Sequence, residues 1–282
     1  MKLGLVLEGG GMRGIYTVGV LDRLMEEGIE ADYVIGVSAG ACNGVSYVSR
    51  QKGRAYRVDM DYLDDKRYGG ISSFLRTKSI FGMDFLFDEI PNHLDPFDYE
   101  TFLASPCEFV TGVTDVDTGE TVYFTKEHLD HDSTVIRASS SIPIFAPIVR
   151  YKGGKYLDGG TSDPIPAGKA LADGCDKLIV VLTRHRDFVK KPEKFRYIYS
   201  RLFRKYPHMI EVLDRRHKVY REEQDLVRRL EREGRAIVVA PSRPIEIGRF
   251  EREREKLQAV YDMAVGDVNR VMNKIAAWNS ER

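Results

Sequence analysis

The residues best placed to do chemistry are a serine and the small residues around it. Residues 36–40 read Gly-Val-Ser-Ala-Gly, directly after an apolar run that predicts a strand and before a run compatible with a helix. This Gly-x-Ser-x-Gly pattern is typical of a nucleophile elbow, in which Gly36 and Gly40 leave room for a sharp turn that exposes the serine hydroxyl. The pattern predicts that Ser38 attacks an acyl ester. The alternative is that five small residues merely close a turn between a strand and a helix.

A second group of small residues, Glu-Gly-Gly-Gly-Met-Arg-Gly at 8–14, follows the first predicted strand. Gly9, Gly11 and Gly14 satisfy Gly-x-Gly-x-x-Gly, a pattern that also occurs in turns that bind the pyrophosphate of a dinucleotide. Such a site needs an acidic residue after the second strand, whereas Asp32 precedes that strand. A dinucleotide-dependent oxidoreductase is therefore disfavoured, and a phosphate cradle remains as the non-catalytic interpretation of the loop.

The two glycine-containing turns are expected to lie side by side, because adjacent parallel strands end at the same edge of a sheet. Attack by Ser38 on an ester places negative charge on the carbonyl oxygen, and exposed backbone N–H groups stabilise such an oxyanion. The amides of Gly9, Gly10 and Gly11 are suited to this role. The pair of motifs therefore favours acyl-ester chemistry more specifically than either motif alone.

A nucleophilic serine needs a base, and none of the six histidines lies in a context typical of one, so each is interpreted as a surface residue. A carboxylate is the other candidate, and Asp158 stands out because it ends a short predicted strand and precedes Gly159 and Gly160. An aspartate with an ordinary pKa near 3.9 is a weak base for a hydroxyl, so the prediction requires burial beside Leu157 and Ile142 to raise that pKa. Without the other two motifs, Asp158 reads as an ordinary turn residue.

In order and rough spacing, the motifs at 9–14, 36–40 and 158–160 resemble the three signatures of patatin-like phospholipases. The segment Ala-Ser-Ser-Ser-Ile-Pro at 138–143 also looks like the stretch that precedes the aspartate in that family. The resemblance covers about residues 1–183.

The resemblance implies a Ser–Asp dyad, with Ser38 as nucleophile and Asp158 as general base. It also implies that the amides of Gly9 to Gly11 lie near the oxyanion and that Arg13 supports their loop. The remaining glycines of the three motifs are expected to allow the tight backbone turns: Gly14, Gly36, Gly40, Gly159 and Gly160. No functional residue is implied beyond residue 183.

The elements that position these residues alternate between short apolar runs and helical patterns, which predicts an α/β fold. We expect a three-layer α/β/α, patatin-like, mostly parallel sheet within a catalytic core at 1–183. A helical insertion at 59–105 would cap the site, and residues 107–125 predict a β-hairpin. Residues 184–282 are expected to form a basic helical extension packed on the core, with a further strand at 236–240 and one long helix at 249–278.

The charges divide unevenly along the chain. The 282 residues carry 43 basic and 43 acidic side chains, so the net charge is zero and a nucleic-acid partner is disfavoured. Residues 1–183 carry a net charge of −9 and residues 184–282 a net charge of +9. The basic, aromatic-rich stretch 184–221 could therefore contact an anionic membrane, or it could simply pack against the acidic first part. Oligomeric state is left open.

The cysteines and apolar runs bear on the surroundings of the protein. Three widely spaced cysteines suit neither a disulfide framework nor a metal site, which favours a reducing, cytoplasmic location. No apolar run reaches the ~20 residues that a membrane-spanning helix needs, so any membrane contact is expected to be peripheral. The acidic pairs lack companions at ligand spacing, and we expect no metal and no cofactor.

The resemblance to patatin-like phospholipases implies a carboxylic ester hydrolase acting on lipid acyl esters, of the phospholipase A or lysophospholipase kind, through an acyl-enzyme. Apolar residues within 71–103 could line an acyl channel, or they could be the core of a small helical cap. The alternative function is a catalytically silent lipid-binding or regulatory module on the same fold.

Overall fold

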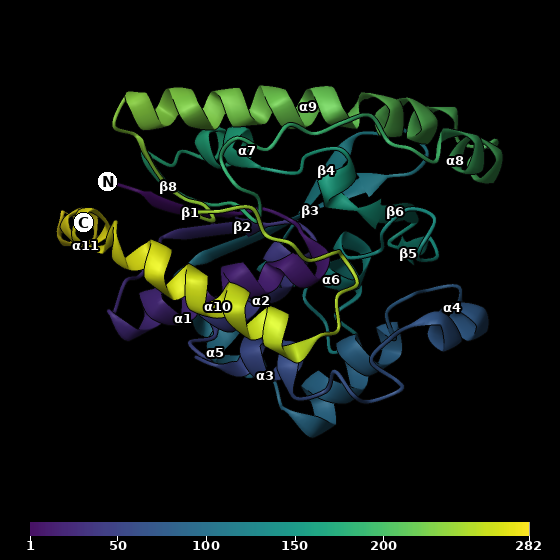
Figure 1. Ribbon diagram of the computed structural model, residues 1–282, viewed down its shortest axis with the longest axis horizontal. Helices are drawn as coiled ribbons and strands as arrows, with labels where there is room; N and C mark the ends of the chain where they lie inside the picture. Colours follow the sequence, from purple (N-terminus) through teal and green to yellow (C-terminus); the bar gives the residue numbers. More distant parts are fainter. Residues whose placement is uncertain (282) are drawn as a thin grey trace.

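The computed structural model describes residues 1–281, and the side chains of all of these except residue 72. A single mixed sheet crosses the molecule, with helices on both of its faces (Figure 1). Its strands are β1 (Leu3–Leu7), β2 (Tyr33–Gly36), β3 (Glu108–Asp115), β4 (Thr121–Thr125), β5 (Val149–Tyr151), β6 (Gly154–Asp158), β7 (Lys177–Val181) and β8 (Ala236–Val239). The predicted three-layer α/β/α fold is therefore confirmed.

The helices are of ordinary length except for one long helix on the upper face in Figure 1. They are α1 (Ile15–Glu26), α2 (Ala39–Val48), α3 (Arg54–Met60), α4 (Ile71–Thr77), α5 (Tyr99–Ala104), α6 (Thr134–Ser139), α7 (Ala167–Ala172), α8 (Arg196–Leu202), α9 (Pro207–Arg232), α10 (Arg254–Asn269) and α11 (Met272–Ser280). A π-helical segment covers Phe85–Leu94, and short 3-10 turns cover Gly11–Gly14, Lys126–His128 and Gly159–Thr161.

The strand order is β5-β6-β3-β2-β1-β7-β8, and β4 pairs with β3 as the predicted hairpin. Strands β3, β2, β1, β7 and β8 form a run of parallel pairs in that order. Strand β3 also pairs in antiparallel orientation with β4 and β6, and β6 pairs in the same way with β5. The parallel order brings the carboxyl ends of β1 and β2 to the same edge. The turns that follow these two strands therefore meet there, as the motifs predicted.

Alternation along the strands builds a core on each face of the sheet. In β1, Leu3, Leu5 and Leu7 point into the core between the sheet and the helices α1, α2 and α10. Val6 points into the core between the sheet and the helices α7 and α9. Because both faces are covered by helices, the strand is apolar throughout.

Residues 184–282 contribute to this same sheet. Strand β8 pairs in parallel with β7, and helix α10 packs on α1 through apolar residues that include Leu257, Ala264 and Val268. Among the described residues, only two ion pairs join residues 1–183 to this part, Lys177–Glu281 and Arg254–Asp64. Apolar packing rather than opposite charge therefore accounts for most of the contact.

The prediction of one helix at 249–278 is wrong, because the chain forms two helices there. The last turn of α10 tightens, with the Val271 amide donating to the carbonyl of Val268 at 3.1 Å, three residues back. Asn269 and the β-branched Val271 are weak helix formers, and the Asn269 side chain instead accepts a hydrogen bond from Arg23. Helix α11 then begins at Met272.

Candidate active site

Ser38 lies at the junction of β2 and α2, in a backbone conformation that side-chain-bearing residues seldom adopt, with φ 54° and ψ −129°. The turn is so tight that a Cβ atom on Gly40 would lie 2.3 Å from the Leu7 carbonyl oxygen, and one on Gly36 would lie 2.6 Å from the carbonyl carbon of Gly40. Only glycine fits at these two positions. The turn thus holds Ser38 at the carboxyl edge of the sheet, with 5% of its surface exposed.

Asp158 ends β6 and faces Ser38, although the two residues are 120 positions apart. The Ser38 hydroxyl donates a hydrogen bond of 2.9 Å to Oδ2 of Asp158, whose other oxygen accepts the amide of Gly160 at 2.7 Å. Asp158 is 6% exposed, and this burial raises the pKa of its carboxyl, while the nearby Arg216 cation and the hydrogen bond from Ser38 oppose the rise. The structure therefore brings together the two residues predicted to form the dyad.

A serine from the segment 138–143, for which the sequence predicted no role of its own, holds the elbow in place. The Ser38 amide donates to the Ser139 hydroxyl at 2.9 Å, and that hydroxyl donates in turn to the carbonyl of Gly112 at 2.7 Å. The Thr114 hydroxyl similarly donates to the carbonyl of Asp158 at 2.8 Å. These bonds join the elbow, β3 and the aspartate, and the run of three serines at 139–141 was their only sequence signal.

The glycine loop lies beside the elbow, where a Cβ atom on Gly9 would come within 3.1 Å of the Ser38 Cβ. Within residues 1–281, the amides of Gly9 and Gly10 donate no hydrogen bond to the protein, so they are free to receive an anion. Gly11 has a positive φ of 57°, and the next amide, that of Met12, donates to the Arg249 carbonyl at 3.1 Å. The loop is thus positioned partly by a residue far along the chain.

Two buried charged side chains lie beneath the loop. Glu8 accepts the Tyr220 hydroxyl at 2.7 Å and the Thr183 amide at 2.6 Å, and burial raises the pKa of its carboxyl. Arg13 is only 5% exposed, and its Nε has no hydrogen-bond partner among the described residues. Burial, together with the cations of Arg184 and Arg249, lowers the pKa of Arg13 to about 9. The predicted role of Arg13 as a support for the loop stays a prediction.

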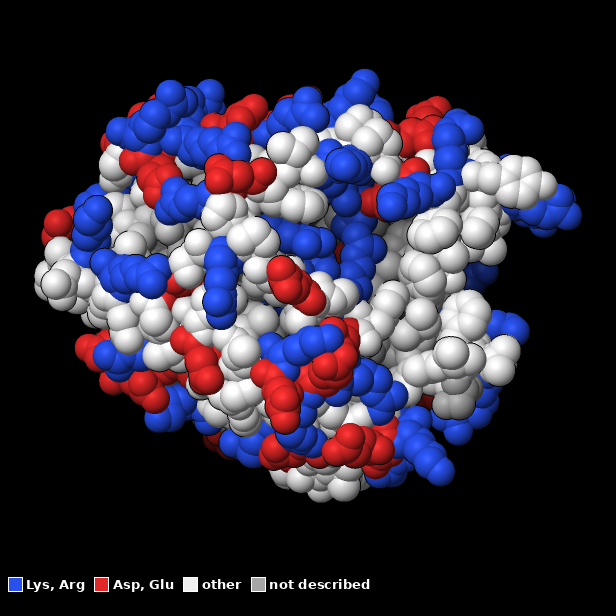
Figure 2. Space-filling view, in the orientation of Figure 1, with Lys and Arg blue, Asp and Glu red and all other residues white. Residues whose placement is uncertain are grey.

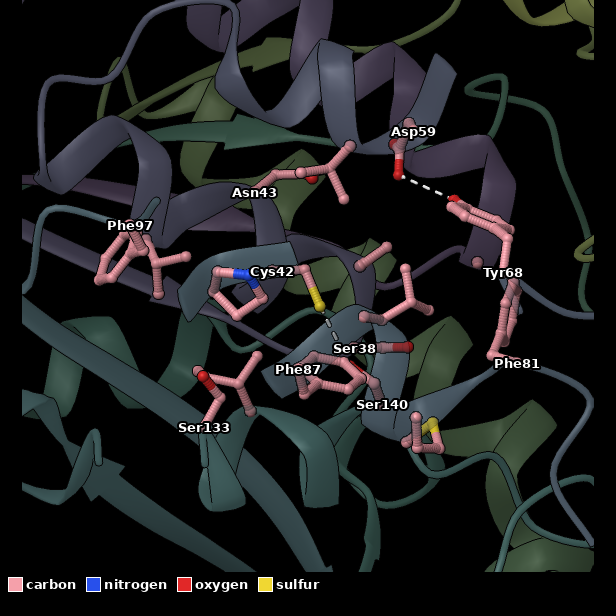
Figure 3. Close-up of a pocket in the computed structure, with 18 of the residues that line it drawn as sticks. Ser38, Cys42, Asn43, Asp59, Tyr68, Phe81, Phe87, Phe97, Ser133 and Ser140 are labelled. Atoms are coloured by element: carbon pink, nitrogen blue, oxygen red, sulfur yellow. Dashed lines mark hydrogen bonds between the residues drawn. The ribbon is translucent and has the colours of Figure 1, made fainter. Parts of the chain in front are cut away.

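Two cavities meet at Ser38, since both are lined by Gly11, Ser38 and Ile142. The first, which we call the acyl cavity, encloses about 960 Å³ including its mouth and receives apolar side chains from the insertion, α2 and α6 (Figure 3). Its apolar lining is Met12, Val45, Val58, Phe81, Met83, Leu86, Phe87, Pro91, Phe97, Leu129, Ile136 and Ile142. This size is in the range of small-ligand pockets.

One carboxyl interrupts the apolar lining of the acyl cavity. The Tyr68 hydroxyl donates a long hydrogen bond of 3.4 Å to Asp59, at the end of the cavity away from Cys42 and Ser140 in Figure 3. Burial raises the pKa of Asp59 to about 7. Near neutral pH this carboxyl is therefore substantially protonated, which lowers the cost of placing it beside apolar groups.

The second cavity, which we call the cationic cavity, has a volume of about 580 Å³ including its mouth. Its charged lining residues are Glu8, Arg13, Asp158, Arg184, Lys190, Arg216 and Arg249. The resemblance implied no functional residue beyond residue 183, so this arrangement was not foreseen, although four of the five cations come from that part of the chain. The density of basic residues at 184–221 was a signal, but it did not indicate which of them face the site.

Other kinds of site are not found in the part of the chain that the structure describes. No group of three or more potential ligand side chains could hold a metal ion there, and no helix is long and apolar enough to cross a membrane. Among the same residues, no histidine lines either cavity at Ser38.

Comparisons with known proteins show which family this chain is similar to. Residues 5–171 match the model of the patatin-like phospholipase family, and residues 206–280 match a domain of unknown function. The uncharacterised protein YjjU of Escherichia coli K12 is 31% identical over 209 residues, which are 69% of this chain and 56% of that protein.

More distant proteins share part of the chain. The lysophospholipase NTE1 of Meyerozyma guilliermondii is 29% identical over 192 residues, which are 64% of this chain and 12% of that enzyme. The chain thus spans about half of the first relative and a small part of the second. The crystal structure of VipD from Legionella pneumophila aligns with a TM-score of 0.46 and 14% identity, over 94% of this chain and 67% of that one.

Proposed function

Because the chain belongs to the patatin-like phospholipase family, we propose that it is a serine lipid acyl hydrolase of the phospholipase A or lysophospholipase kind. The observation that carries the proposal is the 2.9 Å hydrogen bond from Ser38 to the buried Asp158, at the point where the acyl cavity opens beside free glycine amides. The lysophospholipases among the relatives support the same substrate class.

In the proposed reaction, the Ser38 oxygen attacks the ester carbonyl carbon while its proton passes to Asp158. The carbonyl oxygen becomes an oxyanion, which the amides of Gly9 to Gly11 stabilise. Collapse of this intermediate expels the alcohol, to which Asp158 returns the proton, and leaves an ester on Ser38. A water molecule then attacks that ester, again giving its proton to Asp158, and the fatty acid leaves as Ser38 is reprotonated.

The environment of Asp158 suits a general base near neutral pH. A base is most effective when its pKa lies near the working pH, and burial moves the pKa of this carboxyl upward in that direction. The hydrogen bonds from Ser38 and Gly160 fix its orientation before substrate binds. The dyad therefore needs no third residue to orient its base.

Labelling with a fluorophosphonate tests the proposal against the alternative of a silent lipid-binding module. We expect the intact mass of the protein to rise by one adduct on Ser38, no adduct in Ser38→Ala, and release of fatty acid from a lysophospholipid by the unmodified protein only. Circular dichroism serves to establish that the variant is folded. A folded protein that is neither labelled nor active would favour the silent module.

We also propose that the hydrolase acts from the cytoplasm as a peripheral membrane protein, docked through the end of the molecule where α4 and α8 lie (Figure 1). Ile71 and Leu75 on α4 are 80% and 70% exposed, and Tyr197 on α8 is 80% exposed. In Figure 2 white side chains project at this end between blue ones. Exposed basic residues within or close to α8 along the chain are Lys191, Lys194, Arg201, Arg204 and Lys205. Apolar and basic groups together suit an anionic lipid surface.

Lys190 does not belong to this docking surface, although it lies in the basic stretch 184–221 that the sequence suggested for membrane contact. Its side chain is only 12% exposed and pairs with Glu193 at 3.0 Å in the wall of the cationic cavity. The docking surface is better tested at its exposed apolar residues, of which Leu75 lies on α4 and Tyr197 on α8.

Flotation with vesicles of anionic phospholipid tests the docking surface. We expect the double variant Leu75→Ser/Tyr197→Ser to lose binding. The control Leu103→Ser removes an exposed apolar side chain on α5, outside the docking surface, and should keep binding. Raising the salt concentration should weaken binding of the unmodified protein. Equal binding by the double variant and the unmodified protein would contradict the assignment of this surface.

A further inference from the structure

The cationic cavity holds more positive charge than its own carboxylates neutralise. Glu193, next to the cavity, pairs with both Lys190 and Arg216 at 3.0 Å, so this one carboxylate neutralises only one of the two positive charges. Glu8 is engaged by Tyr220 and by a backbone amide.

Three guanidinium groups remain: Arg13, Arg184 and Arg249. None of them forms an ion pair within the described residues, and Arg184 lies over the ring of Phe188 with 4.4 Å from its central carbon to the ring centre. Burial and the neighbouring cations lower the pKa of Arg13 and of Arg249, and Arg184 is one of those cations in both cases. An anion bound among them would remove this repulsion.

The cavity is built to receive such a group rather than merely open to solvent. Arg13 is 5% exposed, lines the cavity and has a buried Nε–H without a partner. A buried donor of this kind costs free energy until a ligand or a water molecule accepts it. Guanidinium groups bind phosphate oxygens in pairs, so three of them suit an anion with several oxygens.

The position of the cavity relative to Ser38 indicates where this anion comes from. Both cavities share Ser38 in their walls, so an ester that reacts there extends its acyl chain into the acyl cavity and its alcohol part toward the cations. In a glycerophospholipid, the glycerol carbons and the ester oxygens alone separate the carbonyl group from the phosphate. The phosphate therefore reaches the next cavity without any need for a long linker.

Resting on the proposed function, we infer that Arg13, Arg184 and Arg249 form a phosphate-binding subsite for the headgroup of the lipid substrate, two of its three arginines being supplied by residues 184–282. A phosphate monoester binds best here, because it carries two negative charges and no cation. A choline headgroup binds less well, since Glu8 and Glu193 are already engaged. A neutral acylglycerol lacks the anion altogether.

The test compares kcat/KM for three substrates with one oleoyl chain: 1-oleoylglycerol 3-phosphate, 1-oleoylglycerophosphocholine and 1-oleoylglycerol. We expect activity to fall in that order for the unmodified protein. Arg249→Gln and Arg184→Gln should each lower the ratio of the phosphate monoester to the neutral ester at least tenfold, because a hydrogen bond to a charged group is lost. Arg249→Lys should recover part of that loss.

Arg215→Gln is the matched control. Arg215 lies on α9 next to Arg216, is exposed and lines neither cavity, so this change should leave the ratio of substrates as it was. Side-chain changes at Arg249 keep the backbone carbonyl that accepts the Met12 amide, which preserves the glycine loop. If Arg249→Gln nevertheless fails to fold, Arg184→Gln carries the test.

The outcomes separate the subsite from the hydrolase itself. If Ser38 is labelled and all substrates are cleaved, but both glutamine variants keep the original ratio, the subsite is wrong and the proposed function stands. If nothing is labelled or cleaved, the proposed function fails. If inorganic phosphate raises the unfolding temperature of the unmodified protein and not of Arg249→Gln, while the substrate ratio is unchanged, the cavity binds free phosphate and the headgroup inference is overturned.

Discussion

Replacing Asp158 by asparagine should lower the rate of the reaction and raise the thermal stability of the protein. The change keeps the shape of the side chain and an oxygen that accepts the Gly160 amide, now 2.7 Å from Oδ1. It removes the group to which Ser38 gives its proton. Loss of a general base of this kind lowers the rate by about 10²–10⁴-fold.

The expected gain in stability follows from the burial of the carboxyl. The folded-state pKa of Asp158 is raised, so the unmodified protein is relatively stable when the group is protonated and loses stability as the pH rises through that pKa. At pH values above the folded pKa, the free energy of unfolding is lower by about 1.4 kcal/mol for each unit by which the folded pKa exceeds the unfolded pKa. Asp158→Asn carries no such cost, so it should unfold at a higher temperature at pH 8, with the difference vanishing near pH 4.

Two measurements on the same samples decide the matter. The rate of fluorophosphonate adduct formation on Ser38 reports the base, and thermal unfolding at pH 4 and pH 8 reports the burial cost. Glu246→Gln, which changes an exposed carboxyl in the same way, should alter neither. Adduct formation by Asp158→Asn at the rate of the unmodified protein would refute the role of Asp158 as the base, whatever its stability.

Three further changes test other parts of the site. Because the pKa of Asp59 is about 7 in the folded protein, the free energy of unfolding of the unmodified protein should fall by about 2 kcal/mol or more from pH 5 to pH 8, and that of Asp59→Asn should not fall in this way. The same change of denaturant midpoint between the two pH values in both proteins would contradict this. Ser139→Ala leaves the Ser38 amide without its acceptor and should slow labelling while costing ~1–3 kcal/mol in urea unfolding. Gly159→Ala places a Cβ 2.1 Å from a backbone oxygen and should prevent stable folding. The control Gly266→Ala, where a Cβ meets nothing within 4 Å, should stabilise α10 by up to ~1 kcal/mol. A soluble, fully stable Gly159→Ala protein would show that the turn can move.

The features that could be predicted from the sequence depend on neighbouring residues. The elbow at Ser38 needs a strand, small residues and a helix in immediate succession, and all three signals lie within about twenty residues. Asp158 could be predicted from its two glycines only because the other motifs supplied the chemistry. The parallel sheet followed from the alternation of apolar runs and helical patterns.

The features that could not be predicted depend on contacts between distant parts of the chain. Arg249 reaches the glycine loop from more than 230 residues away, and nothing in its neighbours distinguishes it from the other arginines of the same segment. Lys190 pairs with Glu193 and is largely buried whereas its neighbour Lys191 is exposed, and nothing in the sequence around the two lysines indicates this difference. The tightened turn at Val271 likewise depends on a side-chain contact of Asn269 with α1.

The position of β1 in the middle of the sheet has a consequence for biosynthesis. One of its edges pairs with β2, which follows within about thirty residues, but the other waits for β7, some 170 residues later. At ribosomal rates of about 5–20 residues per second, that edge stays open for roughly ten to thirty seconds. During this interval a fully apolar strand presents unpaired backbone groups, which is the condition under which nascent chains associate with one another. Chaperones that bind extended apolar segments would therefore find their target in β1, well before Asp158 has been synthesised.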